Sequence, residues 1–258
     1  MDKVLLEKCD GYAVVTLNRP ESMNALSREL RGDFVDAFEE CRRDEGIRVV
    51  ILTGRGKAFC AGFDLKELGE SDQSAAGEAD NTVARAMEAF AGPIIGAING
   101  HAVTGGFEMA LACDVLIASE QARFADTHAR VGMLPGWGLS QKLPRLIGLS
   151  RAKEISLTGM PVFARQAYEW GLVNHVVPVD ELLPRARQIA EAMCACVPEV
   201  LAQYKPLIDE GFGMPYREAL AWEEKRSIAS AERALGAAIG ARREAVLEQG
   251  RREKKDEG

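Results

Sequence analysis

Apolar residues in the first half of the chain form short continuous runs, separated by stretches with helical spacing. The run Arg48–Thr53 has no polar interruption after its first residue, which is typical of a strand covered on both faces. Tyr12–Leu17 is rich in β-branched residues and ends at Asn18-Arg19-Pro20, a turn signal. Two further runs, Pro93–Ile98 and Asp114–Ala118, complete four predicted strands.

Helical patterns lie between these strands. Ser27 is placed to cap a helix that runs to about Glu45, and the apolar positions of this stretch recur at helical intervals. Strands that alternate with helices require crossover connections, which produce parallel or mixed sheets covered by helices. We therefore predict an α/β fold.

From Leu139 onward the pattern is mainly helical, with segments near 150–158, 164–170, 180–196, 198–211 and 215–253 and one short strand at Val173–Val177. The last 40 residues keep scattered apolar positions in an otherwise charged helix pair; these are Trp222, Ile228, Leu235, Ile239 and Val246. Such helices cannot bury their apolar stripe alone, so we expect them to pack on another subunit or on their own core. We assign residues 1–195 to a core and 196–258 to a helical oligomerisation region.

Residues Gly69–Asn81 are polar, with glycine and serine and no buried pattern. Two interpretations stay open for this stretch: a mobile loop with a role at a site, or a plain solvated insertion.

Composition and charge argue against several classes of protein. The 258 residues carry 32 Lys and Arg against 39 Asp and Glu, a net charge of −7, which disfavours binding to nucleic acid. No apolar stretch approaches the roughly 18 residues of a membrane span, and no secretory signal is evident. The six cysteines form no CxxC pair and only three histidines occur, so we expect reduced thiols, no metal site and a cytoplasmic location.

Two glycine-containing segments are candidates for chemistry. Lys57–Lys66 carries small residues that let a ligand approach the backbone, although Asp64 could equally cap the next helical turn. In Asn99–Asp114, Gly105 and Gly106 open an apolar helix whose first N–H groups can bind negative charge on an oxygen. Glu108 lies in the first turn of this helix, where a carboxylate is either catalytic or simply favoured by the helix dipole.

A third segment, Phe124–Trp137, is rich in glycine and proline near its end and contains His128. Taken alone, this histidine is either a hydrogen-bonded structural residue or a catalyst.

Four motifs, in this order, resemble the crotonase (enoyl-CoA hydratase/isomerase) superfamily: LNRPESMNALS, KAFCAGFDL, INGHAVTGGFEMALACDVLIAS and FADTHARVGMLPGWGLSQKLPRLIG. The resemblance runs from about residue 11 to 250. It implies a ClpP/crotonase-like spiral of ββα units with two nearly perpendicular sheets, followed by a C-terminal helical region. It also implies a trimer or a dimer of trimers, and an acyl-CoA thioester as substrate, with no other cofactor.

The resemblance also implies the roles of individual residues. The backbone N–H groups of Phe63 and Gly105 would form an oxyanion hole for the thioester oxygen, and Glu108 matches the first of two glutamates that hydratases of the family use. The residues expected to contact substrate or CoA are Ala25, Leu26, Ala61, Gly62, Phe63, Asp64, Leu65, Lys66, Gly105, Gly106 and Trp137.

The second family glutamate falls at His128, which is a departure from the hydratase pattern. Three interpretations remain open: Glu108 performs both proton transfers with His128 as a helper, His128 is the acid of a modified pair, or the reaction is a different one. The isomerase and dehalogenase members need an acid in the stretch that reads Leu134, Pro135, Gly136 and Trp137 here, which argues against both activities.

The resemblance therefore favours an enoyl-CoA hydratase that adds water to a 2-trans-enoyl-CoA and gives a 3-hydroxyacyl-CoA. The alternatives are another CoA-thioester reaction, such as decarboxylation or hydrolysis, and a catalytically weak acyl-CoA-binding homologue.

Overall fold

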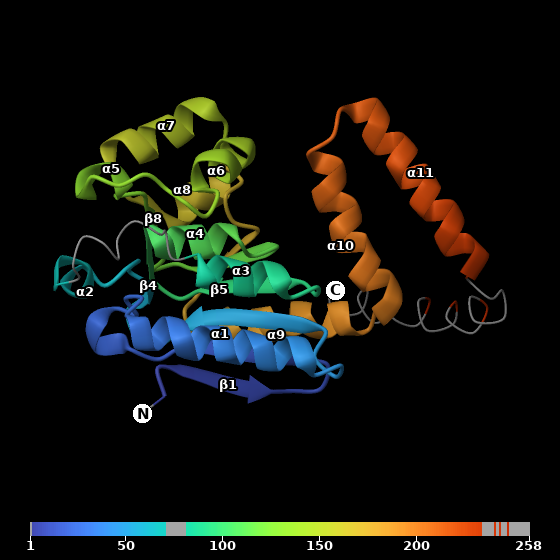
Figure 1. Ribbon diagram of the computed structural model, residues 1–258, viewed down its shortest axis with the longest axis horizontal. Helices are drawn as coiled ribbons and strands as arrows, with labels where there is room; N and C mark the ends of the chain where they lie inside the picture. Colours follow the sequence, from blue (N-terminus) through green and yellow to red (C-terminus); the bar gives the residue numbers. More distant parts are fainter. Residues whose placement is uncertain (1, 71–80, 234–239, 241–242, 244–246, 248–258) are drawn as a thin grey trace. The chain divides into compact units, whose positions relative to one another are not determined.

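A six-stranded sheet forms the centre of the N-terminal part of the chain in the computed structural model (Figure 1). Its strand order is β1-β2-β3-β5-β7-β10, and every neighbouring pair except β1 and β2 is parallel. The strands are β1 (Val4–Lys8), β2 (Tyr12–Leu17), β3 (Val49–Gly54), β5 (Ile94–Ile98), β7 (Val115–Ser119) and β10 (His175–Val177). The predicted parallel or mixed α/β arrangement is confirmed, although β1 was not predicted.

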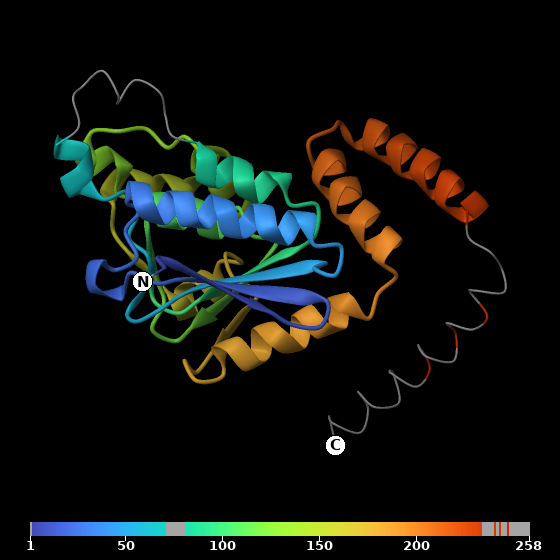
Figure 2. The same cartoon turned by 60° about the horizontal axis from the view of Figure 1, so that its bottom comes forward.

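Helices cover both faces of this sheet (Figure 2). On one face, Val15, Leu52 and Ile98 share a core with α1 (Arg28–Arg43) and α3 (Thr82–Ala89). On the other face, Val14 and Ile51 pack against α9 (Leu182–Cys194), which presents Leu182, Ala186 and Ala190 at intervals of four residues. Successive strand residues point to opposite faces, which explains why the central strands read as continuous apolar runs.

A smaller sheet of very short strands lies beside the large one. Its order is β4-β6-β8-β9, with β4 (Ala58–Cys60), β6 (His101–Val103) and β8 (Arg123–Ala125) parallel and β9 (Val162–Phe163) antiparallel to β8. None of these strands was predicted, because runs of two or three residues are too short to show a period of two.

The chain order repeats a strand of the large sheet, a strand of the small sheet and a helix. This order occurs as β3–β4–α2 (Leu65–Glu70), β5–β6–α4 (Gly105–Leu111) and β7–β8–α5 (His128–Val131). Each small-sheet strand therefore ends just before the helix of its turn, and the three ends lie at the same edge of the small sheet. The spiral of ββα units implied by the resemblance is thus present.

The predicted helices are present with small differences at their ends. Ser27 caps α1 by accepting a hydrogen bond from the backbone N–H of Leu30, as expected. The remaining helices of this part are α6 (Leu139–Ile147), α7 (Leu149–Thr158) and α8 (Ala164–Glu169), and a short 3₁₀ turn, η1, spans Pro20–Ser22.

The structure describes residues 2–70 and 81–233, together with residues 240, 243 and 247. The chain divides into two compact units, Met1–Leu201 and Ala202–Gly258. The second unit contains most of α10 (Pro198–Phe212) and all of α11 (Tyr216–Arg233). Most of Gly69–Asn81, and the predicted helix beyond 233 with Leu235, Ile239 and Val246, lie outside the described residues. The domain assignment of 1–195 and 196–258 stays a prediction. Among the described residues, no helix combines the length and the apolar character that crossing a bilayer requires.

Candidate active site

The predicted oxyanion-hole residues, Phe63 and Gly105, lie side by side at the edge of the small sheet. Cys60 of β4 pairs with Ala102 of β6, and Phe63 and Gly105 each follow three residues after these paired positions. The two segments are in close approach, since a Cβ atom added to Gly62 would lie 3.2 Å from the backbone nitrogen of Gly105. Within the described part of the chain, neither the Phe63 N–H nor the Gly105 N–H donates to a protein acceptor. Both amides are therefore available to a ligand oxygen.

The Gly105 amide is held by an unusual backbone conformation at the preceding residue. Thr104 has φ 53° and ψ −112°, which is strained for a β-branched side chain. Its N–H donates to Ala125 O at 2.9 Å, and its hydroxyl shares a hydrogen bond with the hydroxyl of Thr127. These contacts connect β6 to the segment after β8 and hold Gly105 at the first position of α4.

Gly106 explains how α4 starts so close to the small sheet. A Cβ atom at this position would lie 2.0 Å from the carbonyl oxygen of Cys60, so only glycine fits. The N-terminus of α4 therefore packs directly on the backbone that leads to Phe63.

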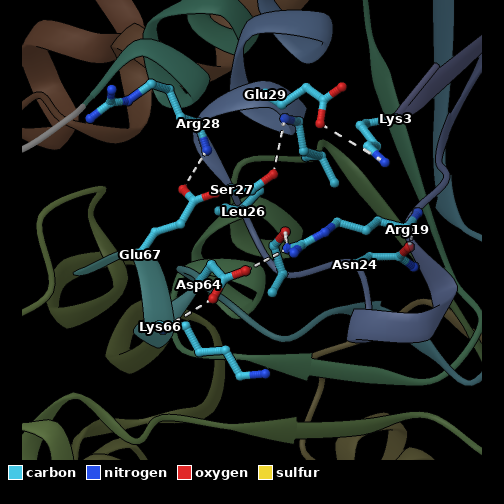
Figure 3. A network of polar contacts seen from close by, with 12 residues as sticks. Lys3, Arg19, Asn24, Leu26, Ser27, Arg28, Glu29, Asp64, Lys66 and Glu67 are labelled. Carbon is cyan, nitrogen blue, oxygen red and sulfur yellow. Dashed lines mark hydrogen bonds and ion pairs between the residues drawn. The ribbon is translucent and has the colours of Figure 1, made fainter. Parts of the chain in front are cut away.

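A polar network holds the Phe63 segment from its other side (Figure 3). Leu26 pairs with Phe63 in an isolated parallel bridge, in which the Leu26 N–H donates to Gly62 O at 2.8 Å. Asp64 accepts a hydrogen bond from Arg19 Nη1 at 2.6 Å and one from the Lys66 N–H at 3.0 Å. The capping role considered for Asp64 is therefore present, and the Arg19 guanidinium holds the pKa of the Asp64 carboxyl below its usual value, against the opposing effect of burial.

Asn24 is the fully buried centre of the same network. Its Nδ2 donates to the carbonyl oxygens of Arg55, Ala58 and Phe59 at 3.0, 2.8 and 3.1 Å. Its Oδ1 accepts the backbone N–H of Arg19 at 2.9 Å. With φ 55°, Asn24 occupies the left-handed region, which asparagine tolerates better than most residues. This side chain thus anchors the start of β4, the strand that leads to Phe63, and the turn before it.

Glu108 projects from the first turn of α4 and is 2% exposed. One carboxylate oxygen, Oε1, accepts the backbone N–H of Trp137 at 2.7 Å. The other, Oε2, lies 3.5 Å from Nε2 of His128. The backbone of the 134–137 segment therefore orients the carboxylate without neutralising it.

His128 is the first residue of α5 and is 6% exposed. Its Nδ1 lies 2.7 Å from Oδ1 of Asp126, and its backbone N–H donates to the same oxygen at 3.1 Å. Burial alone lowers the pKa of His128, but the hydrogen bonds and charges of Asp126 and Glu108 outweigh it and raise the pKa to about 9.

Aromatic rings border the site. The rings of Phe63 and Trp137 lie 5.4 Å apart, and Nε1 of Trp137 donates to Asn81 Oδ1 at 3.0 Å. The Arg31 guanidinium lies 5.2 Å from the centre of the Phe63 ring. These contacts attach Trp137 both to the oxyanion segment and to the start of α3.

The structure brings the predicted residues 25–26, 61–64, 105–106, 108, 128 and 137 together. Leu65 and Lys66 begin α2 and are exposed, so they lie at the outer end of this group. Among the described residues, no three His, Cys, Asp or Glu side chains gather in a way that would hold a metal ion.

Sequence reasoning missed Arg19, Asn24, Thr104 and Asp126 as parts of the site. The only available signal was the spacing of Asp126 and His128, since an acid two residues before a histidine can reach its ring.

Comparison with known proteins agrees with this arrangement. A family model described as enoyl-CoA hydratase/isomerase matches residues 7–233. The chain belongs to this family. A protein of Arabidopsis thaliana named probable enoyl-CoA hydratase 1, peroxisomal, is 46% identical over 217 residues, which cover 84% of this chain and 82% of that one. A short-chain-enoyl-CoA hydratase of Clostridium acetobutylicum is 37% identical over 229 residues, covering 87% and 88%.

Solved structures of the family share the fold. The crystal structure of an enoyl-CoA hydratase from Bacillus anthracis superimposes with a TM-score of 0.87 at 35% identity and covers 96% of each chain. The membership predicted from the four motifs is therefore confirmed, and so is the crotonase fold.

Proposed function

We propose that this protein is an enoyl-CoA hydratase, which adds water across the double bond of a 2-trans-enoyl-CoA and gives a 3-hydroxyacyl-CoA. Family membership and the hydratase names of the relatives support this reaction. The observation that carries it is the buried Glu108 carboxylate, which lies in the first turn of the helix that begins with the Gly105 amide. A base beside an oxyanion site is what hydration of an enoyl thioester requires.

The two amides would act on the thioester carbonyl. Attack of water at C3 moves the electrons of the double bond toward the carbonyl and creates an enolate. In this proposal the N–H groups of Phe63 and Gly105 would donate to this oxygen, and the dipole of α4 would add to the effect. Losing one such donor typically lowers the rate by about 10²–10³-fold.

Glu108 would take the proton from the attacking water. Its Oε1 is already satisfied by the Trp137 N–H, which leaves Oε2 to accept the proton. The product also needs a proton at C2, and the only buried acid-base partner that contacts Glu108 among the described residues is His128.

CoA would lie along the segments that meet at Phe63. Ala25 and Leu26 run beside Ala61–Asp64, so the small residues expected to contact the pantetheine form one continuous edge. Lys66 is exposed at the start of α2, where its ammonium group would meet a CoA phosphate. Apart from CoA as part of the substrate, the proposed reaction uses no cofactor.

We also propose a trimer or a dimer of trimers. The support is α10, which exposes Tyr204, Ile208 and Phe212 at intervals of four residues and so presents an apolar stripe. A cytoplasmic location stays a prediction.

The test is hydration of crotonyl-CoA and of longer 2-trans-enoyl-CoA thioesters, followed as loss of the ultraviolet absorbance of the conjugated enoyl group. Glu108→Gln should lower kcat by about 10²–10⁴-fold while the melting temperature stays close to that of the parent. Glu39→Gln on α1, outside the site, is the matched control and should keep the parent's rate. A parent protein that binds these thioesters but turns over none of them would be a weak homologue, and the proposed function would be wrong.

A further inference from the structure

Asp126 is a buried carboxylate that the proposed reaction has not yet used. It lies in the turn between β8 and α5, and its side chain is 3% exposed. Besides its two contacts with His128, it lies close enough to the hydroxyl of Ser156 for that group to help lower its pKa. These hydrogen bonds lower the pKa of Asp126 despite the opposing effect of burial, so the group is an ionised acceptor near neutral pH.

We propose that Asp126 is a positioning residue, which fixes the ring of His128 with Nε2 on the side of Glu108 and keeps the ring protonated, so that His128 is the proton donor to C2. This inference rests on the proposed hydratase function and identifies the second acid-base group of the site. It selects one of the three roles that the sequence leaves open for His128.

The contacts determine which ring nitrogen carries a proton. An ionised carboxylate can only accept, so the 2.7 Å contact with Asp126 Oδ1 requires a proton on Nδ1 of His128. The opposite ring nitrogen, Nε2, then faces Oε2 of Glu108 at 3.5 Å. A ring between two carboxylates is stabilised as the imidazolium, with both nitrogens protonated. Asp126 thus sets both the orientation and the protonation of the ring.

The charged groups that act on His128 are these two carboxylates, one from the β8–α5 turn and one from α4. Because they hold the pKa of His128 at about 9, the ring carries its proton throughout the neutral range. A protonated histidine can supply the proton that a carboxylic acid supplies in the family pattern.

Water, Glu108 and His128 account for every proton that moves in the proposed reaction. Glu108 removes a proton from water while the water oxygen bonds to C3, and the π electrons of the double bond form the enolate. The Nε2–H bond of His128 then breaks and its proton bonds to C2. The site is left with a protonated Glu108 and a neutral His128. Transfer of one proton from Oε2 to Nε2, along their existing contact, restores both groups, and the net reaction is the addition of one water molecule.

A purely structural role for Asp126 explains only part of its geometry. An aspartate before a helix commonly accepts a backbone N–H, and the 3.1 Å bond to the His128 N–H is such a contact. That bond does not require the ring of His128, which nevertheless makes the shorter contact of 2.7 Å with the same oxygen.

The test compares Asp126→Asn with the parent and with Asp33→Asn, a control on α1 whose carboxylate accepts the Lys3 N–H. An amide at 126 cannot hold the imidazolium, so kcat should fall by about 10²-fold while KM changes little. The alkaline limit of the pH–rate profile should move to lower pH. The protein contains three histidines, so ¹⁵N NMR can follow His128 separately, and its pKa should fall in the same variant.

A double variant separates positioning from packing. In a His128→Glu background the carboxylate of Asp126 would face a second carboxylate and repel it. In the His128→Glu background, Asp126→Asn should therefore leave kcat unchanged or raise it, whereas it lowers kcat when His128 is present. An equal loss in both backgrounds would mean that Asp126 acts through stability alone.

The outcomes for the two proposals are distinct. If the parent hydrates crotonyl-CoA, and Asp126→Asn keeps its kcat and pH profile, the inference about Asp126 is wrong and the hydratase function stands. If the parent shows no hydration, the function is wrong, and the NMR titration still decides the role of Asp126. Should Asp126→Asn not fold, the parent spectrum suffices: a His128 pKa near 6.5, or an unprotonated Nδ1, would overturn the inference.

Discussion

Asn24→Ala should show how strongly the polar network below the site supports the fold. The change removes three donations to the carbonyls of Arg55, Ala58 and Phe59 and one accepted bond from Arg19. At about 1 kcal/mol net for each bond, the loss is about 3–4 kcal/mol. Alanine at φ 55° adds about 1 kcal/mol of backbone strain. We therefore expect the free energy of unfolding to fall by about 4–5 kcal/mol, a large share of the roughly 5–15 kcal/mol of a typical domain.

Urea unfolding followed by circular dichroism measures this change. Asn18→Ala is the matched control, because its side chain makes solvent-exposed hydrogen bonds, and it should lose less than about 1 kcal/mol. Asn24→Asp places a carboxylate oxygen against the same three carbonyl oxygens at a fully buried position, so it should destabilise at least as much as the alanine variant. Below the unfolding transition, Asn24→Ala should also hydrate crotonyl-CoA more slowly, because β4 no longer holds Phe63 in place. A loss of less than about 1 kcal/mol would show that the carbonyls of β4 find other partners, and would refute the reasoning.

Two further predictions concern packing and pH. Gly106→Ala places a Cβ atom 2.0 Å from the Cys60 carbonyl oxygen, so it should lower the free energy of unfolding by at least about 1–3 kcal/mol and abolish hydration. Gly32→Ala is the control, because the space around this glycine is open, and it should leave the stability of the protein unchanged or raise it. Equal melting temperatures for the two variants would contradict this prediction. The folded pKa of His128, about 9, lies above its usual value of 6.5, so the stabilisation from its protonated ring is complete below pH 6.5 and is lost as the pH rises through 9. Unfolding free energies of the parent should therefore converge with those of His128→Gln as the pH rises, and a constant difference would contradict the assignment.

Much of the large sheet could be predicted because burial on both faces leaves a clear trace in the sequence. Tyr12–Leu17 was predicted with its observed bounds, and Ser27 was recognised as a cap because its bond to Leu30 is local. The small sheet could not be predicted in the same way. Its strands of two or three residues carry no period, and they exist because segments from neighbouring turns of the chain pair with one another.

The site shows the same division between local and long-range contacts. Gly105, Glu108 and His128 could be singled out from local features, because glycines at a helix start, an acid in the first turn and a lone histidine can be read from the sequence. Phe63 followed only from the resemblance to the crotonase superfamily. Asn24 acts on carbonyls more than thirty residues away, so no local pattern marks it. The bond from the Trp137 N–H to Glu108 likewise depends on how α4 meets the segment before α6, 29 residues later in the chain.

The parallel register of β4 and β6 has a geometric consequence for the reaction. The two strands pair at Cys60 and Ala102, and a Cβ atom at Gly62 would lie 3.2 Å from the Gly105 nitrogen, so the two segments stay close beyond their last strand pair. Both donors are main-chain amides, so their placement depends on the pairing of β4 and β6 and on the glycines at 62 and 106. Sequence changes in the surrounding loops should leave it intact as long as those two strands stay paired.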